Sequence, residues 1–411
     1  MKKVVLTALT LTALVFTGCS SDDDVALNPN GGGNPEEETS GDGIITSIDD
    51  DDFKPSDLKG DVTGDIKLVA GTEYTLTGPL RVKEGATLEI EAGTTIKATA
   101  GGSDVFVAIE RGAKIEANGT ASAPITFTSS ASNPRSGDWG GIVLAGKAPS
   151  NVGVDAQTEV AGLKYGGTVV DDNSGTLSYV IAKYTGARID GEQEFNGISF
   201  FGVGSGTTVN NIVVENGDDD GVEFFGGTVS VTNLMVVNAK DDMLDWTFGW
   251  TGTVNNAILI REKDFTAVTK DPRGIEGDSN EDNTAATPLS NPTINNITIV
   301  NDALSTVEMS DMIKVRRGSK VTITNAIVAL GSDNGSKAGD FIDLTDTKGG
   351  ADAAATITVR GINIDESDVK NEVNATINID ASTTGADLTV FGFANYDFTV
   401  VNEILDSKEQ I

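Results

Sequence analysis

The sequence predicts an all-β protein built as a parallel β-helix, and three observations support this prediction. From about residue 60 onward, short runs of β-branched residues alternate with Gly, Asn and Asp turns, as in TLEIEAGTTIKA and TITNAIVAL. No long stretch has the period of about 3.6 residues that an amphipathic helix requires. A short motif with a shared asparagine also recurs along the chain. Together these features indicate short strands stacked as repeats.

The repeat is clearest in the segments VNNIVV, VTNLMVV, VNNAILI, INNITIV and ITNAIVA. Their shared asparagines are 22, 23, 40 and 29 residues apart, at Asn211, Asn233, Asn256, Asn296 and Asn325. A step near 22 residues suits one turn of a parallel β-helix, called a rung below, and the longer steps indicate inserted loops. Asn tolerates a left-handed backbone at a turn, and its amide can bond the Asn of the next rung.

An all-β sandwich is the main alternative to the β-helix. A sandwich predicts two-residue hairpin turns and strict alternation of inward and outward residues. The chain has few such hairpin signals, and many runs such as IVVEN end in small polar turns. The β-helix is therefore the favoured fold.

The first 18 residues predict a bacterial lipoprotein signal peptide. MKK is a short basic region, VVLTALTLTALVF is an apolar region too short for a convincing membrane span, and FTGC places small residues before a cysteine. This pattern resembles a lipoprotein signal, which implies cleavage before Cys19 and lipidation of that residue. An ordinary secretory signal that happens to contain a cysteine is the alternative. Because Cys19 is the only cysteine, no intrachain disulfide can form.

Residues 19–43 predict an acidic, flexible tether between this lipid anchor and a β-helix over residues 44–411. The segment is rich in Gly, Asn, Pro and acid and has no apolar period. The acidic run SSDDD after Cys19 resembles the surface-export signal of Bacteroidetes lipoproteins. We therefore expect a protein anchored by lipid in the outer membrane and facing the cell exterior. The segment SIDDDDF (Ser47 to Phe53) either belongs to the tether or begins the fold.

Composition excludes several classes of function. The formal net charge is −33, so no basic footprint for nucleic acid is present. The chain has no histidine, which excludes a Ser-His-Asp triad and a His-ligated zinc site. Any acid–base chemistry would fall to Asp, Glu, Lys, Arg or Tyr. The acidic excess instead favours cations or cationic partners.

Two acidic segments, NGDDDGVEFFGG and NAKDDMLDW, form the candidate site because they are one repeat apart. Their acids are offset by the same 22 residues as Asn211 and Asn233. They should stack on successive rungs, about 4.8 Å apart. The predicted pairs are Asp219 over Asp241, Asp220 over Asp242, and Glu223 over Asp245. Like charges at this spacing repel by about 1 kcal/mol per pair in water, and by several at an effective dielectric of about 20.

Three arrangements could offset this repulsion. The first is a bound cation such as Ca²⁺, which takes about 6–8 oxygen ligands; the candidate ligands are Asp220, Glu223, Asp242 and Asp245. The second is a bridging basic side chain, with candidates Lys240, Arg261, Arg273, Lys314, Arg316 and Arg317. The third is a raised pKa that keeps one carboxyl protonated and makes it a general acid. Alternatively, the acids are structural groups at exposed turns, where water screens their charge.

A second group of charged residues is expected on the same side. KDPRGIEGDSN supplies Arg273 and Glu276, and DMIKVRRG supplies Lys314 and Arg316. Because alternate residues of a strand share a face, Lys314 and Arg316 should point together and Arg317 should point away.

Aromatic residues gather near the acids although the chain is poor in them: Phe224, Phe225, Trp246, Phe248 and Trp250. By strand alternation, some of them must line the interior. An outward-facing Trp246 or Trp250 would instead offer a platform for a sugar ring.

Four segments carry a resemblance to a known family: VFVAIERGAKIEANGTASAPITFTSS, RSGDWGGIVLAGKAP, DDGVEFFGGTV and DPRGIEGDSN. They resemble β-helix lipoproteins of Bacteroidetes and other Gram-negative bacteria over roughly residues 60–400. The resemblance implies a right-handed, single-stranded, pectin-lyase-like parallel β-helix at the cell surface. Some members resemble neighbours of TonB-dependent outer-membrane transporters, which implies a role in uptake but supplies no activity.

Three functions remain open from the sequence. The first is a non-catalytic binding or accessory protein, serving a TonB-dependent transporter, whose acids bind a cation or other ligand. The second is a carbohydrate-active enzyme, either a polysaccharide lyase or a glycoside hydrolase, acting on a surface polysaccharide with the same carboxylates. No active-site motif of a catalytic β-helix family can be matched residue by residue. The third is an adhesin or structural stalk.

The final stretch, FGFANYDFTVVNEILDSKEQI, is expected to cap the open end of the stack. An uncovered last rung would expose strand edges to solvent and to other chains.

Overall fold

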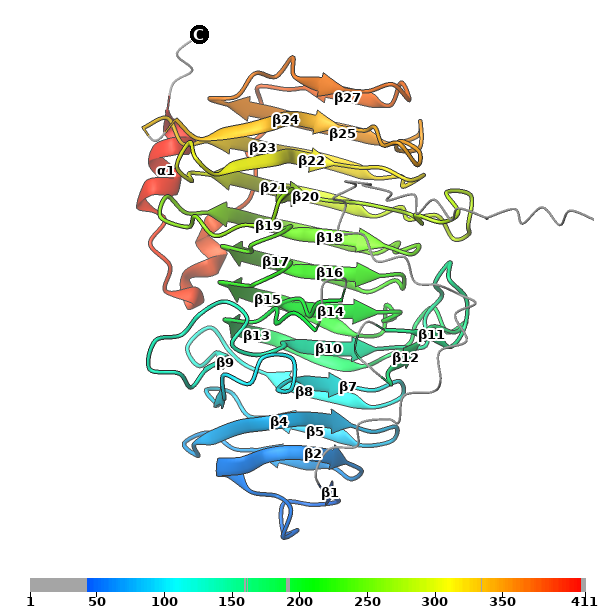
Figure 1. Ribbon diagram of the computed structural model, residues 1–411, viewed down its shortest axis with the longest axis vertical. Helices are drawn as coiled ribbons and strands as arrows, with labels where there is room; N and C mark the ends of the chain where they lie inside the picture. Colours follow the sequence, from blue (N-terminus) through cyan, green and yellow to red (C-terminus); the bar gives the residue numbers. More distant parts are fainter. Residues whose placement is uncertain (1–42, 159, 161, 190–192, 334, 408–411) are drawn as a thin grey trace, which may run out of the picture.

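The computed structural model describes residues 43–407, except 159, 161, 190–192 and 334. These residues form a parallel β-helix in which strands of successive rungs pair in parallel along the long axis (Figure 1). The predicted fold class is therefore confirmed. The predicted signal peptide, Cys19 and the tether up to residue 42 lie outside the described residues.

Each rung contributes to three faces, called A, B and C here. Face A stacks β1 (Ile44–Ile45), β2 (Leu58–Val62), the end of β4 (Tyr74–Val82), β7 (Val107–Ile109), β10 (Ile142–Ala145), β14 (Ile198–Phe201), β16 (Val222–Phe225), β18 (Leu244–Thr247), β20 (Arg273–Ile275), β22 (Glu308–Lys314), β24 (Lys337–Asp343) and β26 (Val369–Lys370). Face B begins with β3 (Ile66–Leu68), β5 (Thr87–Ile90) and β8 (Lys114–Asn118) and ends with β27 (Thr376–Ile379). Face C begins with the start of β4, β6 (Thr95–Ala98) and β9 (Ile125–Ser129).

From the middle of the molecule onward, one long strand per rung serves both face B and face C. These strands are β13 (Gly175–Lys183), β15 (Thr208–Glu215), β17 (Ser230–Val237), β19 (Thr253–Arg261), β21 (Thr293–Asn301), β23 (Thr322–Leu330) and β25 (Thr356–Ile362). Outside the stack, β11 (Ala156–Gln157) and β12 (Lys164–Tyr165) form a small antiparallel pair. A single 3-10 turn, η1 (Pro55–Asp57), precedes β2.

The repeated asparagines form the corner between faces B and C. All five have left-handed backbones, with φ between 54° and 66°. Asn233 donates to Asn211 Oδ1 at 2.8 Å, and Asn256 donates to Asn233 Oδ1 at 3.0 Å. This series of amide hydrogen bonds shifts by one residue across the longest insertion, where Asn296 donates to Asn255 instead of Asn256. It then continues with Asn325, which donates to Asn296 at 2.7 Å. The expected turn geometry and amide bonding are confirmed.

The interior is a continuous apolar column that includes Trp246 and Trp250. Both indoles are fully buried, and the Trp250 ring stacks on Phe224 with centroids 4.0 Å apart. The possibility of an outward sugar platform at either tryptophan is therefore wrong, because both side chains point into the core.

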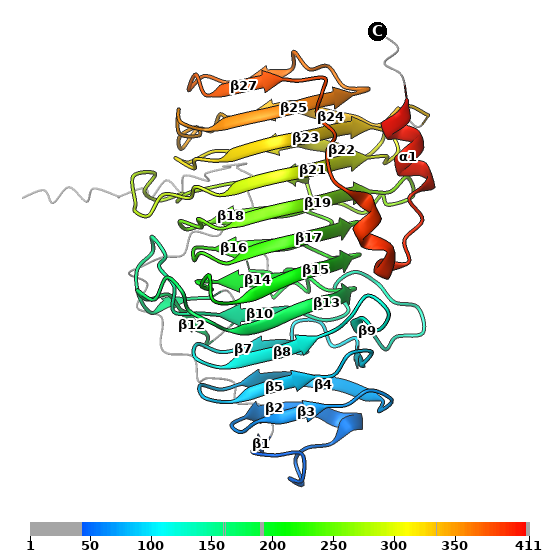
Figure 2. The same cartoon turned by 180° about the vertical axis from the view of Figure 1, so that it is seen from behind.

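The C-terminal segment covers the side of the stack, so the predicted end cap is wrong. The turn η2 (Leu388–Ala394) and helix α1 (Thr399–Asp406) run back along face C, drawn in red in Figures 1 and 2. Phe391, Val401 and Ile404 pack there on outward apolar side chains such as Met235 and Ile258. Face C is apolar on both sides over many rungs, so it needs cover along its length. Among the described residues, no helix is long and apolar enough to cross a membrane.

Candidate functional site

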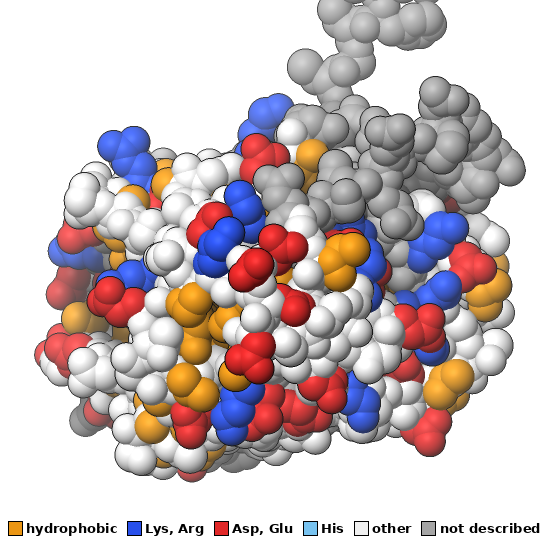
Figure 3. Space-filling view, turned by 90° about the horizontal axis from the view of Figure 1, so that it is seen from below, with side chains coloured by type: hydrophobic (Ala, Val, Ile, Leu, Met, Phe, Trp, Pro, Cys, Tyr) orange, Lys and Arg blue, Asp and Glu red, His pale blue; other side chains and the backbone are white. Residues whose placement is uncertain are grey.

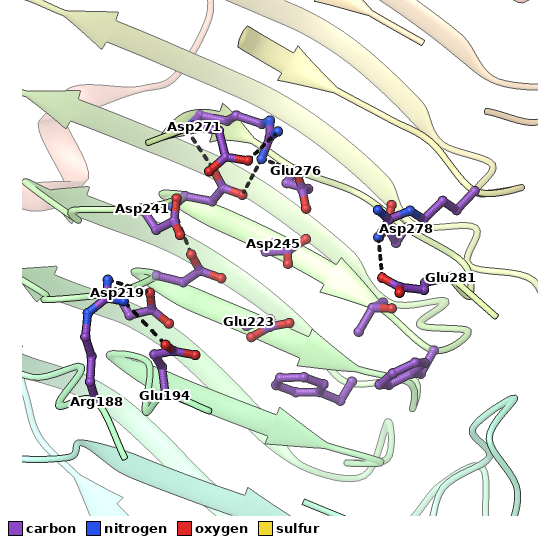
Figure 4. A pocket seen from close by; sticks show the side chains of 17 residues that line it. Arg188, Glu194, Asp219, Glu223, Asp241, Asp245, Asp271, Glu276, Asp278 and Glu281 are labelled. Atoms are coloured by element: carbon purple, nitrogen blue, oxygen red, sulfur yellow. Dashed lines mark hydrogen bonds and ion pairs between the residues drawn. The ribbon is translucent and has the colours of Figure 1, made fainter. Parts of the chain in front are cut away.

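The acids of the two repeated segments stack on face A as the sequence predicts. Glu223 and Asp245 are directly paired in the β16–β18 register. The N–H of Asp242 donates to Asp220 Oδ1 at 2.9 Å, so these two residues lie on adjacent rungs at the same position. Figure 4 shows Asp241 above Asp219 and Asp245 above Glu223.

The strand register extends these pairs into two rows of outward side chains. The first row runs Asn196, Asp220, Asp242, Arg273, Asp311 and Asp340. The second row runs Ser199, Glu223, Asp245, Glu276, Lys314 and Asp343. The lower half of both rows is acidic or neutral, and basic residues enter only from Arg273 upward.

The lower half of the rows, with nearby loops, encloses a cleft (Figure 4). Its lining residues are Arg188, Glu194, Asp219, Asp220, Glu223, Phe225, Asp241, Asp242, Asp245, Thr247, Phe248, Asp271, Arg273, Glu276, Asp278, Glu281 and Arg317. These comprise eleven carboxylates and three guanidinium groups, so the formal charge of the lining is −8 when all are ionised. Phe225 and Phe248 form an apolar wall that belongs to a cluster of buried apolar side chains outside the interior column of the β-helix.

Burial of the acids shifts their protonation toward neutral pH. Burial raises the pKa of Asp220 well above its ordinary value, and the charges of Asp219 and Asp242 add to this effect. Burial and the charge of Glu276 likewise raise the pKa of Asp242. The pKa of Asp241 rises to about 6, again mainly because of burial. The cleft without a bound cation therefore retains protons that exposed carboxyls would lose.

Arg273 is the main basic group within the rows. Its side chain lies 3.0 Å from Asp271, 3.1 Å from Asp311 and 3.7 Å from Asp242, and it also pairs with Glu276. Burial would raise the pKa of Glu276, but Arg273 and Arg316 outweigh burial and lower it. Arginine thus favours the ionised form of Glu276, whereas at Asp242 burial and the charge of Glu276 outweigh the charge of Arg273.

The predicted alternation after Lys314 fails at Arg317. Strand β22 ends at Lys314, and Arg317 has a left-handed backbone with φ of 51°. Arg316 and Arg317 therefore both reach Asp278, at 3.0 Å and 2.9 Å. Arg316 does not line the cleft, but it pairs with two carboxylates that do, Glu276 and Asp278.

Lys314 does not join the cleft to which sequence reasoning assigned it. Its ammonium group pairs with Asp343 at 2.7 Å. Asp343, Asp311 and Asp340 form a second acid group farther along face A, where Lys370 also contacts Asp340 at 2.6 Å. Each acid of this second group therefore already pairs with a basic side chain: Asp311 with Arg273, Asp343 with Lys314 and Asp340 with Lys370.

Several lining residues were missed because they lie outside the repeat. Arg188 comes from the segment between β13 and β14 and contacts Asp218 at 3.3 Å and Glu194 at 3.4 Å. Asp271 and Glu281 belong to the long insertions on either side of β20. Asn196 does not line the cleft but donates to Glu223, and the repeat could have revealed it, because it occupies the position of Asp220 one rung earlier.

The spacing of the acids suits a hard divalent cation. Three overlapping sets bring one oxygen per residue within 4.8 Å of the others: Asp219, Asp220 and Asp241; Asp220, Glu223 and Asp245; Asp242, Asp245 and Glu276. Oxygens on opposite sides of one Ca²⁺ lie about 5 Å apart, since each Ca²⁺–oxygen distance is about 2.3–2.6 Å. The residues present therefore fit such an ion in kind and spacing.

Comparison with known families gives one match. A family model described as a pectate-lyase-like beta helix domain matches residues 60–397. This range includes every residue of the cleft and most of the described chain. No curated protein and no solved structure matches the chain.

Proposed function

The chain belongs to the family of pectate-lyase-like β-helix domains, and we propose that it acts as a non-catalytic binding protein whose acidic cleft holds a divalent cation such as Ca²⁺. The observation that supports this proposal is the presence of stacked carboxylates, which form sets whose oxygens lie within 4.8 Å of one another. Their repulsion, together with their burial, gives a cation a large favourable interaction that solvated surface acids lack.

The size of the cleft supports a cation rather than a sugar ring. The cavity volume is about 80 Å³. One water molecule needs about 10–15 Å³, so an ion with several waters fits. A typical small-molecule site measures about 300–1,000 Å³. The cleft is therefore well below the size that encloses a saccharide unit.

The cellular setting belongs to the same proposal. The leader, Cys19 and the acidic run after it support a lipoprotein of the outer membrane that faces the exterior. In that place, a cation-loaded β-helix would serve as an accessory protein for a TonB-dependent uptake system. This partnership is supported only by the sequence resemblance, and co-purification from outer membranes tests it directly.

Calorimetric titration with Ca²⁺ tests the cation site. We expect residues 44–411 to bind Ca²⁺, and the Asp220→Asn/Asp242→Asn variant to lose that binding while keeping its fold by circular dichroism. A matched control is Asp365→Asn, because Asp365 is an exposed acid in a turn far from the cleft in sequence. Equal binding by wild type and the double variant would contradict the proposal.

One observation favours a carbohydrate-active enzyme as a second candidate. The raised pKa values of Asp220 and Asp242 are what a general acid needs, since such a group must hold a proton at working pH. A polysaccharide lyase or glycosidase would lose turnover in either Asn variant while retaining its fold. Turnover of an anionic or neutral polysaccharide by wild type, abolished by Asp242→Asn, would replace the binding proposal. If neither Asp220→Asn nor Asp242→Asn changes cation binding or turnover, an adhesin or stalk is favoured instead.

A further inference from the structure

We propose that face B, from β13 to β27, is an ice-binding surface formed by two uncharged rows of hydroxyl and amide side chains. This function goes beyond the cation site proposed for face A. The two sites lie on different faces of the β-helix and share no residue, so either proposal can fail without the other.

Two outward rows run along face B, one on each side of inward apolar residues such as Val209 and Val254. The first row is Thr176, Thr208, Ser230, Thr253, Thr293, Thr322, Thr356 and Thr376. The second row is Ser178, Asn210, Thr232, Asn255, Asn295, Thr324, Thr358 and Asn378, with a register irregularity before Thr358. Every residue of both rows is at least partly exposed. Figure 2 shows the strands that carry them stacked one above another.

Neither row contains a charged or aromatic residue from β13 to β27, in a chain of which 22% of residues are charged. The first three strands of face B show that the same position accepts charge, because the first row there consists of Lys67, Glu89 and Glu116. Lys67 and Glu89 form an exposed ion pair of 2.7 Å. The high β-propensity of Thr explains part of the composition, but Asn is depleted in strands. Strand formation alone therefore does not account for the two rows.

The rows form a regular lattice of hydrogen-bonding groups. Successive rungs lie about 4.8 Å apart, and the rows lie about 6.6 Å apart because they are separated by two residues along each strand. In a tetrahedral network of O–H···O bonds of about 2.75 Å, as in ice, second-neighbour oxygens lie about 4.5 Å apart. The mismatch with the rung spacing adds up to only about 1 Å over three rungs. Patches of face B therefore match the spacing of an ice surface.

The side chains of the rows are restrained before any ligand binds. Thr is stiff at χ1 because it is β-branched. In the second row, Ser178 donates to Asn210 Oδ1 at 2.7 Å. Asn255 Oδ1 accepts at 3.2 Å from Asn296, a residue of the asparagine corner. Binding to a rigid lattice therefore costs these side chains little conformational entropy.

The chemistry of the rows favours ice over other partners. Protein interfaces are enriched in aromatic residues and arginine, and both rows lack them. An ammonium group is strongly hydrated and orders the water around itself, so a face without charges disturbs a water lattice least. The array is also long, since eight rungs span about 34 Å. A crystalline neutral polysaccharide presents a repeating hydroxyl surface as well, and it is the competing ligand in the tests.

The first test is partitioning of the fluorescently labelled protein into ice that grows slowly from solution. We expect the ice to take up the protein, whereas growing ice excludes ordinary globular proteins. We also expect a gap between the melting and freezing points of single ice crystals. The measurements are made in EDTA, so their outcome does not depend on the cation site. Exclusion from ice would overturn the proposal, and so would binding to crystalline cellulose or chitin by a protein that ice excludes.

The second test places one charge in the array with Asn255→Asp. This change hardly alters the volume of the side chain, and its oxygen can still accept from Asn296. We expect the fraction of protein taken up by ice to fall several-fold. The matched control is Asn118→Asp, because Asn118 is exposed and precedes Ser178 in the second row, outside the uncharged array. Uptake of Asn255→Asp at the wild-type level would overturn the assignment to face B.

The third test disrupts the first row with Thr293→Lys, which adds both bulk and charge at the middle of the array. We expect this variant to be excluded from ice while its circular dichroism stays that of wild type. The matched control is Thr95→Lys, because Thr95 is an exposed strand residue of β6 on face C. Ice uptake by folded Thr293→Lys at the level of Thr95→Lys would overturn the role of the first row. If Thr293→Lys does not fold, Asn255→Asp decides the proposal.

Discussion

At the scale of single residues, Asp220 and Asp242 on face A are unusual because they are buried beside other acids and have raised pKa values. Asp220 and Asp242 lie on adjacent rungs and are largely buried, and the backbone N–H of Asp242 donates to the Asp220 carboxylate at 2.9 Å. Ordinary turn aspartates of this chain behave differently. Asp365, for example, is exposed, and its pKa is lowered by hydrogen bonds from the Ser367 side chain and backbone. Burial beside other acids therefore distinguishes the site from the many structural aspartates.

These raised pKa values predict a specific dependence of stability on pH. The pKa of Asp241 is about 6 in the folded chain, against an ordinary value of 3.8. Its contribution to folding is complete below pH 3.8 and is lost as pH rises through about 6. In EDTA, we expect Asp241→Asn to remove part of the fall in unfolding free energy between pH 5 and 7.5. The difference should be about 1.4 kcal/mol, since the rest of the linkage falls below pH 5.

Urea unfolding of wild type and Asp241→Asn at both pH values measures this difference. Asp365→Asn serves as the control, because its carboxyl has a lowered pKa and lies in a solvent-exposed turn. An identical change with pH in wild type and Asp241→Asn would show that Asp241 ionises as freely as an exposed acid.

At the scale of structural elements, the asparagine corner is a stabilising device of the stack. Asn233 has φ of 58°, donates to Asn211 and accepts from Asn256. Asn233→Ala should lower the unfolding free energy by about 2–4 kcal/mol, because it loses both bonds and places a Cβ-bearing residue in a left-handed conformation that no local hydrogen bond supports.

The substitution Asn233→Gly separates the two causes. Glycine adopts the left-handed backbone without steric cost, so it should lose only the hydrogen bonds and destabilise less than alanine. Denaturant unfolding measures both variants against wild type. If glycine is as destabilising as alanine, backbone strain is not part of the role of Asn233.

The C-terminal segment is a second stabilising element, since it buries the outward apolar surface of face C. Phe391 is fully buried between η2 and face C. Phe391→Ala should therefore cost about 3–5 kcal/mol, as expected for a large core side chain. Val400 in α1 is 50% exposed, so Val400→Ala should change stability by no more than about 0.5 kcal/mol.

Thermal and denaturant unfolding of these two variants test the packing of the C-terminal segment. Equal, small effects would mean that η2 and α1 contribute little to the folded state. A large effect confined to Phe391→Ala would show that face C depends on its cover.

At the scale of the whole molecule, most of the fold could be predicted because the residues that recur in the repeat have defined structural roles. The step from Asn211 to Asn233 sets the rung length, and the acids follow the same step. Stacked register then follows from geometry, as the pairing of Glu223 with Asp245 shows.

What could not be predicted depends on contacts that have no repeat. The cover of face C was missed because the outward apolar residues of β17 and β19 look like core residues in a sequence. The direction of Arg317 was missed because its left-handed backbone breaks strand alternation. Arg188 reaches the cleft from a loop, so only the folded chain brings it close to Asp219.

Acidic side chains are not distributed evenly over the surface of the molecule. Seen from the β1 end, acidic, basic and apolar side chains are mixed (Figure 3). On face A, by contrast, the cleft gathers eleven carboxylates around a cavity of about 80 Å³. A net charge of −33 thus becomes a defined site only where the rungs align their acids.

A crystal structure determined from crystals grown in millimolar Ca²⁺ would test the cation site most directly. We expect an ion peak in the cleft, with oxygens of the stacked carboxylates about 2.3–2.6 Å from the ion. If the cleft contains only waters at hydrogen-bond distances in millimolar Ca²⁺, the proposed cation site is contradicted.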